Sequence, residues 1–318
     1  MRINNKYIQV GFMGKLAYRH MGTLVCCLAI LPAMTACTEG SMDYRGNEGT
    51  VTITPIWTSA NLPAEVKYYF YPASGGSPTQ VTTDARQVET ILPTGTYRVL
   101  AYNTDAVGVT HKNQESHQTA MAELLPQKVS RAVSYIGQPE KVYSLYLEQI
   151  EVPYQSSVSR QVDAMSHCRN LILEFLFDGT GQVTTLSGSM TGIYNSILLA
   201  GGDPTYQAVQ NSAHTAIDFT TTLSENTGTA GVRVLGLHNP QNGQQYRSLM
   251  EITVTLSDGQ RKKTTLDLSG TLTQVLETNG GKLPVEVPVN IQIRVKDIST
   301  ELSASVTGWS QGNGSGDI

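Results

Sequence analysis

Short runs of alternating hydrophobic and polar residues dominate the sequence from residue 50 onward. In the first run, Val51, Ile53, Pro55 and Trp57 alternate with threonines, which is the period-two pattern of a half-buried β-strand. The pattern recurs along the chain and predicts further strands at Glu65–Tyr71, Val88–Leu92, Thr96–Tyr102, Leu171–Phe177, Gln182–Gly192, Ala216–Leu223, Val232–Leu237, Leu249–Leu256 and Thr264–Leu268. The chain is therefore predicted to be all-β.

Turn sequences rich in glycine, proline and aspartate separate these strands. Pro93-Thr94-Gly95 and Ser257-Asp258-Gly259-Gln260 are the clearest, because glycine can adopt the positive φ of a tight hairpin turn. Short strands about 8–12 residues apart, with turns between them, are typical of β-sandwiches. We predict two tandem antiparallel β-sandwich domains, 49–155 and 156–309, joined at the polar stretch Gln155–Ser159.

Two segments interrupt the strand pattern and are expected to form short helices. Ala120–Leu125 ends a polar stretch. Pro139–Ile150 has proline at a possible first helical position and apolar residues at helical spacing. Val152 and Tyr154 indicate an extended continuation of this second segment.

The longest alternation lies near the end of the chain, at Val285–Lys296. Pro288 cannot donate a main-chain hydrogen bond, so this strand is expected at a sheet edge or paired on one side over part of its length. Beyond Trp309, residues 310–318 are rich in glycine and are expected to form a flexible tail. One face of the strand carries six apolar residues, Val285, Val287, Val289, Ile291, Ile293 and Val295.

The first 36 residues have the plan of a secretory signal peptide. Basic residues without acids precede the apolar run Leu24–Leu31, and Pro32 and small residues follow it. The run is too short for a transmembrane helix, which needs about 20 residues. Met34-Thr35-Ala36-Cys37 looks like a bacterial lipobox, so Cys37 is predicted to become the lipidated N-terminus, on a tether of residues 37–48. An ordinary signal peptidase site that happens to precede a cysteine is the alternative.

Removal of the leader leaves 282 of the 318 residues. The net charge becomes −8, because the leader holds four of the 22 Lys and Arg residues and none of the 26 acidic residues. An acidic chain without basic clusters gives no electrostatic footprint for nucleic acid. Arg261-Lys262-Lys263 is the single basic run, and its position after a turn indicates a solvated hairpin end.

The cysteines offer no disulfide between folded segments. Cys26 and Cys27 leave with the leader, Cys37 carries lipid, and Cys168 stands alone. His167 is adjacent to Cys168, but sequence neighbours in a strand point to opposite faces. A buried structural thiol is therefore expected at Cys168.

Known catalytic and cofactor motifs are absent from the sequence, and we expect neither enzymatic activity nor a cofactor. His111 and His117 have no carboxylate cluster near them in the sequence and are therefore weak candidates for metal ligands. The aromatic residues at Trp57 and Tyr68–Tyr71 could form a sugar-stacking platform, although alternation sends about half of the rings inward and favours a core role.

These features together resemble a group of lipoproteins of the Bacteroidales. The resemblance begins with the lipobox and the acidic tether and covers nearly the whole mature chain. It is strongest to an uncharacterised two-domain family, and the fimbrial anchor lipoproteins of the same bacteria, minor subunits of type V pili, are similar in layout. The segments that carry it are Trp57, Val66–Pro72, Leu92–Asp105, Gln138–Tyr143, Ser187–Ala200, Leu249–Gln260 and Val306–Trp309.

The resemblance implies two sandwiches of the fimbrillin or transthyretin-like type, held at the outer membrane by lipid on Cys37 and facing outward or into the periplasm. It also implies fimbrillin-like subunits as partners, docked by β-strand addition. Pro288, Arg294 and Lys296 look like partial blocks to pairing, which fits an internal strand Val285–Lys296 whose neighbour is the docking edge. Stalk subunits of this group are cut after an arginine. Arg45 is the only arginine of the tether, and a cut there would sever the lipid anchor and remove no strand, which suits an anchor or an independent lipoprotein better than a stalk subunit. An exposed tether residue with no processing role is the favoured interpretation of Arg45.

Two other functions stay open from the sequence. One is a surface glycan-binding lipoprotein of a nutrient-uptake system, and the other is an enzyme with spatially paired carboxylates. Neighbouring fimbrillin-like genes would favour the fimbrial interpretation, whereas transporter and glycosidase genes would favour glycan binding.

Overall fold

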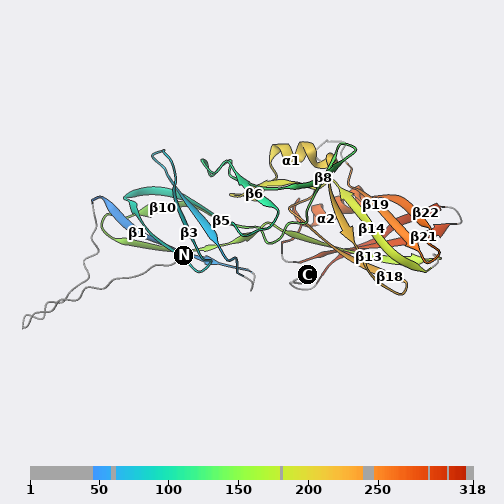
Figure 1. The fold of residues 1–318 in the computed structure, drawn as a ribbon. Helices are drawn as coiled ribbons and strands as arrows, with labels where there is room; N and C mark the ends of the chain where they lie inside the picture. Colours follow the sequence, from blue (N-terminus) through green and yellow to red (C-terminus); the bar gives the residue numbers. More distant parts are fainter. Residues whose placement is uncertain are drawn as a thin grey trace, which may run out of the picture. The chain divides into compact units, whose positions relative to one another are not determined.

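The computed structural model describes residues 46–58, 62–179, 182–238, 247–285, 287–298 and 301–312. In this part of the chain nearly all regular structure is β-strand, and the strands form two β-sandwiches (Figure 1). The predicted all-β sandwich fold is confirmed.

The first sandwich packs a three-stranded sheet against a five-stranded sheet. The smaller sheet has the order β11 (Ser157–Asp163), β1 (Glu48–Ile56), β4 (Val88–Pro93). The larger sheet has the order β12 (Met165–Ser166), β10 (Tyr143–Val152), β5 (Gly95–Asn103), β2 (Val66–Pro72), β3 (Thr79–Thr83). β1 and β11 are parallel, in register from Thr50 with Ser157 to Ile56 with Asp163.

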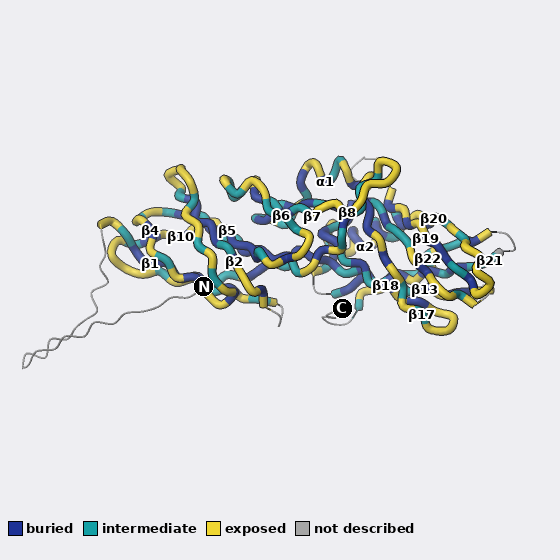
Figure 2. Tube along the Cα trace, in the orientation of Figure 1, coloured by how far each residue is buried: buried dark blue, intermediate teal, exposed yellow. Residues whose placement is uncertain are grey.

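The core of this sandwich is formed by the apolar residues at every second position of its strands. Val51 and Ile53 of β1 are fully buried against Tyr68 and Phe70 of β2 and Val99 of β5. Tyr69 and Tyr71 on the opposite face of β2 are buried as well, so five of its seven residues are buried (Figure 2). A sheet strand buried on both sides reads as a nearly continuous apolar run, which is what the sequence of β2 shows.

The second sandwich packs a five-stranded sheet against a six-stranded sheet. The five-stranded sheet has the order β17 (Thr222–Ser224), β18 (Thr227–Val234), β13 (Arg169–Asp178), β21 (Val289–Ile298), β22 (Glu301–Gln311). The six-stranded sheet has the order β20 (Arg261–Asp267), β19 (Leu249–Leu256), β14 (Val183–Thr191), β16 (Thr215–Thr220), β9 (Val133–Ile136), β8 (Pro126–Ser130). The core between them includes the stacked rings of Phe175 and Phe219.

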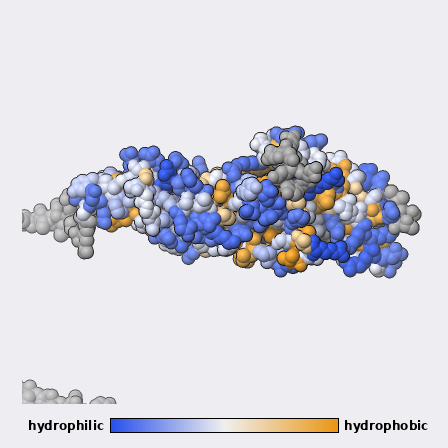
Figure 3. All heavy atoms as spheres, turned by 90° about the horizontal axis from the view of Figure 1, so that it is seen from above, coloured by the Kyte–Doolittle hydropathy of each residue, from blue (hydrophilic) through white to orange (hydrophobic). Residues whose placement is uncertain are grey.

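Shorter elements complete the second sandwich and its junction with the first. A third sheet has the order β15 (Ser196–Leu198), β7 (Met121–Leu124), β6 (Val109–Lys112). The helical elements are α1 (Tyr206–Asn211), the 3₁₀ turn Ser212–His214 and α2 (Ser269–Thr278). On the face drawn in Figure 3, hydrophilic residues predominate and hydrophobic residues form only small groups.

Several sequence-based expectations need correction. Ala120–Leu125 and Pro139–Ile150 form no helices, because they contain strands β7 and β10, which pair with distant strands. The pairing is not antiparallel throughout, since β1 with β11, β13 with β21 and β9 with β16 are parallel. Strand β22 runs to Gln311, so the first two residues of the predicted tail belong to a sheet.

Strand pairing crosses the predicted domain boundary at 155/156 in both directions. β11 and β12 follow that point but pair with the first sandwich, whereas β8 and β9 precede it but belong to a sheet of the second. The division into domains of residues 49–155 and 156–309 therefore stays a prediction, and we propose that the first sandwich extends to Ser166.

Candidate functional sites

The predicted docking strand is an internal strand of the second sandwich. β21 begins at Val289, so Val285 and Val287 precede it, and it pairs with β13 on one side and β22 on the other. Pro288 also lies before the strand, so it does not interrupt the pairing. Of the two positions expected for this strand, the sheet edge is therefore wrong and the internal position is confirmed. The side chains of Val289, Ile291, Ile293 and Val295 are at most 1% exposed and belong to the core.

The neighbour of β21 is the sheet edge. Strand β22 is 11 residues long and ends the five-stranded sheet. Its sequence, ELSASVTGWSQ, contains no lysine, arginine or proline, which are the residues that commonly protect an edge from pairing with another chain. Two features partly cover this edge. Strand β20 of the opposite sheet packs against β22, with Lys262 ion-paired to Asp297, and a register shift opposite Gln292 and Ile293 leaves Thr307 as a bulge in β22.

The edge strand of the opposite sheet contrasts with β22. Strand β20 begins with Arg261-Lys262-Lys263. The side chain of Lys262 is only 15% exposed and pairs with Asp297, so the expectation of a solvated run holds for Arg261 and Lys263 but not for Lys262. Lysines on an edge disfavour pairing with a further strand. Of these two edges, β22 is therefore the one without cationic side chains.

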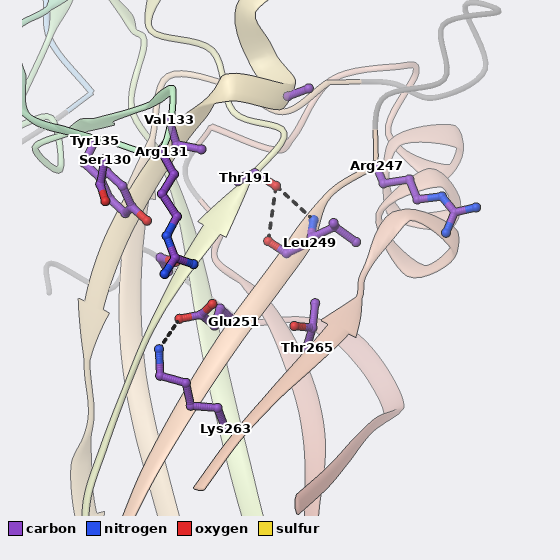
Figure 4. Close-up of a pocket in the computed structure, with 12 residues that line it drawn as sticks. Ser130, Arg131, Val133, Tyr135, Thr191, Arg247, Leu249, Glu251, Lys263 and Thr265 are labelled. Carbon is purple, nitrogen blue, oxygen red and sulfur yellow. Dashed lines mark hydrogen bonds and ion pairs between the residues drawn. The ribbon is translucent and has the colours of Figure 1, made fainter. Parts of the chain in front are cut away.

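A polar hollow of about 790 Å³ lies on the outer face of the six-stranded sheet (Figure 4). Its floor is set by cross-strand register, because Ser189 of β14 faces Glu251 of β19, which faces Thr265 of β20. Thr191 closes one end of the floor by exchanging hydrogen bonds with the main chain of Leu249, at 3.2 and 3.3 Å. Outward-facing residues of neighbouring strands thus give the floor a mostly polar surface.

The β8–β9 hairpin forms a wall of the hollow. Tyr135 of β9 lines the hollow and pairs with Lys128 of β8, whose ammonium lies 4.4 Å from the centre of the ring. Arg131 and Ala132 form the turn with φ angles of +49° and +65°. Hairpin turns with two positive φ angles strongly prefer Asn-Gly, and other L-residues cost about 1–2 kcal/mol each in this conformation.

Three cations and one carboxylate line the hollow. Lys263 binds Glu251 at 3.0 Å, and Arg247 lies 3.7 Å from Asp267 outside the lining. Arg131 has no hydrogen bond or ion pair with any residue of the described ranges, and Figure 4 shows its side chain extending from the turn over the sheet. The lining carries a net charge of +2 in a chain whose sequence sums to −4.

His111 and His117 do not form a metal site. His111 stacks on Tyr102 with ring centroids 4.1 Å apart, and burial lowers its pKa to about 4. His117 stacks on Tyr146 at 5.8 Å, next to Tyr71. Among the described residues, no group of three or more His, Cys, Asp or Glu side chains could hold a metal ion.

The aromatic cluster of the first sandwich serves mainly as core. Tyr68 and Phe70 face the interior of the sandwich, while Tyr69 and Tyr71 are buried on the other face of β2. Trp57 is partly buried and donates a hydrogen bond to the carbonyl of Ala85. The expectation of a core role for most of these rings is confirmed.

Cys168 is a buried structural thiol, as expected. Its Sγ donates to the carbonyl of Glu140 at 2.5 Å, and burial raises its pKa to about 11. The neighbouring His167 instead contacts the hydroxyl of Ser144, with Nε2 and Oγ 2.6 Å apart. The two side chains therefore do not act as a catalytic pair.

The predicted lipidation site, Cys37, and Arg45 lie outside the described residues. No helix in the described ranges is long and apolar enough to cross a membrane. The sequence analysis placed partner docking next to β21, the neighbour of β22. It did not predict the hollow, because pairing between distant strands brings its residues together, among them Arg131, Ser189, Arg247 and Thr265.

The fold is similar to that of solved candidate adhesins and of a fimbrial anchor protein. A candidate adhesin from Bacteroides ovatus superposes with a TM-score of 0.58 at 18% identity, over 81% of this chain and 95% of that one. The fimbrial anchor protein Mfa2 from Porphyromonas gingivalis gives 0.51 at 11% identity, over 83% and 97%. A candidate polysaccharide-binding protein (DUF1812) from Bacteroides thetaiotaomicron gives 0.51 at 11% identity, over 83% and 98%.

Residues 47–212, just over half of the chain, match the family described as domain of unknown function DUF5119, and the protein belongs to this family. No curated protein matches the sequence. The structural likenesses support the resemblance to the fimbrillin-like group at the level of the fold.

Proposed function

We propose that this protein is a cell-surface adhesion or fimbrial subunit, without enzymatic activity, that binds fimbrillin-like partners by β-strand addition at β22. The observation that carries the proposal is the 11-residue edge strand β22, which contains no lysine, arginine or proline. Main-chain hydrogen bonds to such an edge supply affinity, and pockets for alternate side chains supply specificity. The described relatives in fold include a candidate adhesin and a fimbrial anchor protein.

We further propose that Cys37 anchors the protein to the outer membrane. Stable anchoring takes two lipid signals, because one acyl chain binds only marginally, and a lipoprotein cysteine carries more than one chain, for example palmitate. Strand β1 begins at Glu48, after Arg45. A cut after Arg45 would separate the fold from Cys37 and leave every described strand in place, so an uncut anchor fits better than a processed stalk subunit.

The experiment is a proline substitution at each of two adjacent positions of β22, Ala304 and Ser305. Successive residues of an antiparallel strand direct their amides to opposite sides, so one of the two amides points toward β21 and the other away from it. The variant that loses the outward amide should fold normally, judged by circular dichroism and urea unfolding, and should lose its partners. The other variant removes a hydrogen bond to β21 and is the matched destabilised control.

Partners are identified by cross-linking in the producing cells, purification of the tagged protein and mass spectrometry. The proposal is supported if fimbrillin-like proteins co-purify with the wild-type protein but not with the variant that lacks the outward-pointing amide. If a folded variant keeps every partner, or the wild-type protein has none, strand addition at β22 is excluded.

A surface glycan-binding role is the second candidate. The observation that favours it is the polar hollow, which exposes a tyrosine ring, hydroxyl groups and unpaired positive charge on one sheet face.

A further inference from the structure

We infer that the polar hollow on the outer face of the six-stranded sheet binds an anionic polysaccharide. This goes beyond strand addition at β22 and does not require it, since the hollow lies on β8, β9, β14, β19 and β20. The two proposals can therefore fail separately.

The charge of the hollow selects an anion. Arg131 reaches over the sheet without an ion partner among the described residues, and Arg247 is held only loosely, 3.7 Å from Asp267. Glu251 is already neutralised by Lys263. An arginine guanidinium presents paired N–H donors that match a carboxylate or a sulfate, so both uronate and sulfate groups fit the chemistry.

The rest of the lining suits a sugar chain better than a protein. Protein interfaces have a central apolar core with aromatic anchors, whereas the floor here consists of Ser189, Thr191 and Thr265 beside the half-exposed Leu249. The hydroxyl groups of Ser189 and Thr265 can exchange hydrogen bonds with ring hydroxyls, whereas that of Thr191 is engaged with Leu249. The ring of Tyr135 stands at the wall, where a pyranose can pack against it.

The turn that carries Arg131 supports a binding role. Two consecutive non-glycine residues with positive φ are held in place by the pairing of Ser130 with Val133. Strained backbone of this kind persists where the surrounding structure enforces it, and it clusters at functional sites. An asparagine would suit the turn better than Arg131 does, so the arginine is explained by its side chain and not by the backbone.

The test is direct binding of purified protein to two anionic polymers, polygalacturonate and chondroitin sulfate, with uncharged dextran as the neutral probe. Biolayer interferometry at low and at physiological salt gives the affinities. We expect binding to at least one anionic polymer, weaker at higher salt, and none to dextran. The polymer preferred identifies carboxylate or sulfate as the recognised group.

Four variants locate the site. Arg131→Gln should weaken binding about tenfold, the equivalent of one charge-assisted hydrogen bond. Arg131→Asn should weaken binding equally while raising the melting temperature, because asparagine suits the turn.

Glu251→Gln should strengthen binding, since it frees Lys263. Arg160→Gln, an exposed arginine of β11 that bonds only the neighbouring Ser159 carbonyl, is the matched control and should bind like the wild type.

Any of three results would overturn the inference. Dextran binding as tightly as the acidic polymers would exclude charge recognition. Equal weakening by Arg160→Gln and Arg131→Gln would indicate diffuse surface charge. Absence of binding to both anionic polymers would exclude the ligand class, with the β22 proposal untouched.

Discussion

The buried histidine at the junction of the two sandwiches should make the protein sensitive to mild acid. His167 is 1% exposed and its Nε2 lies 2.6 Å from Oγ of Ser144, whose hydroxyl donates to the carbonyl of Leu199, also at 2.6 Å. Nε2 must therefore donate to Ser144, which leaves Nδ1 without a proton. Nδ1 has no hydrogen-bond partner within the described part of the chain.

The neutral ring is favoured in the folded state, and this fixes the sign of the pH effect. Burial, with the positive charges of Arg169 and Lys282, lowers the pKa of His167 from 6.5 to about 3. The unfolded chain therefore binds a proton more readily than the native state does below pH 6.5, so acid favours unfolding. The stabilisation is fully present above pH 6.5 and is lost progressively as the pH falls toward 3.

The loss of stability in acid can be calculated from the pKa shift of His167. Each pH unit between the two pKa values changes the free energy of unfolding by about 1.4 kcal/mol. At pH 5, His167 alone should lower the stability by about 2 kcal/mol relative to pH 8. His111, whose pKa burial lowers to about 4, adds a separate loss over much of the same range.

The assay compares the wild type with His167→Gln by urea unfolding at pH 8, 7, 6 and 5, followed by circular dichroism. Glutamine can keep an N–H donor toward Ser144 but does not titrate, so the variant should lose about 2 kcal/mol less than the wild type between pH 8 and pH 5. His214→Gln, at an exposed position, is the control and should follow the wild-type profile. Equal slopes for the wild type and His167→Gln would refute the reasoning.

Three further outcomes are expected. Phe175→Ala removes a 2% exposed ring stacked on Phe219 and should lower the free energy of unfolding by about 3–5 kcal/mol in urea titrations; a loss below about 1 kcal/mol would contradict the packing. Asn290→Pro and Gln292→Pro should both misfold, as judged by circular dichroism, because β21 is paired on both sides; a native spectrum for both would contradict this pairing. Cys37→Ser should move the protein out of the membrane fraction or leave its leader uncleaved, whereas wild-type recovery there with the leader removed would exclude the lipid anchor.

The alternation of hydrophobic and polar residues predicted the strands correctly where neighbouring strands pair in a regular register. The runs around Val51 and Ile53 and around Leu171–Phe177 became β1 and β13 with the expected inward faces. The helix predicted over Pro139–Ile150 was wrong because this segment contains β10, whose pairing shifts register between Leu147 and Ile150. A bulge moves the inward face by one residue, and the apolar spacing then resembles that of a helix.

Other features depend on contacts between distant residues and leave little local signal. β13 and β21 are parallel neighbours more than 100 residues apart, so the sequence could not show that Val289–Val295 would be internal. The same holds for the hollow, whose residues come from five strands, the β8–β9 turn, the 3₁₀ turn and the segment before β19. Helix α2 did have a signal, because Leu272, Val275 and Leu276 follow helical spacing and are buried, but the segment is only ten residues long.

Photo-cross-linking at the edge of β22 tests the proposed role most directly. A photoreactive residue is placed at Ser305 of β22 or, as the matched control, at Lys263 of the charged edge strand β20, and intact producing cells are irradiated. Adducts with fimbrillin-like subunits from Ser305, and none from Lys263, are the result expected of strand addition at β22. Absence of such adducts from Ser305, or equal adducts from both positions, would contradict it.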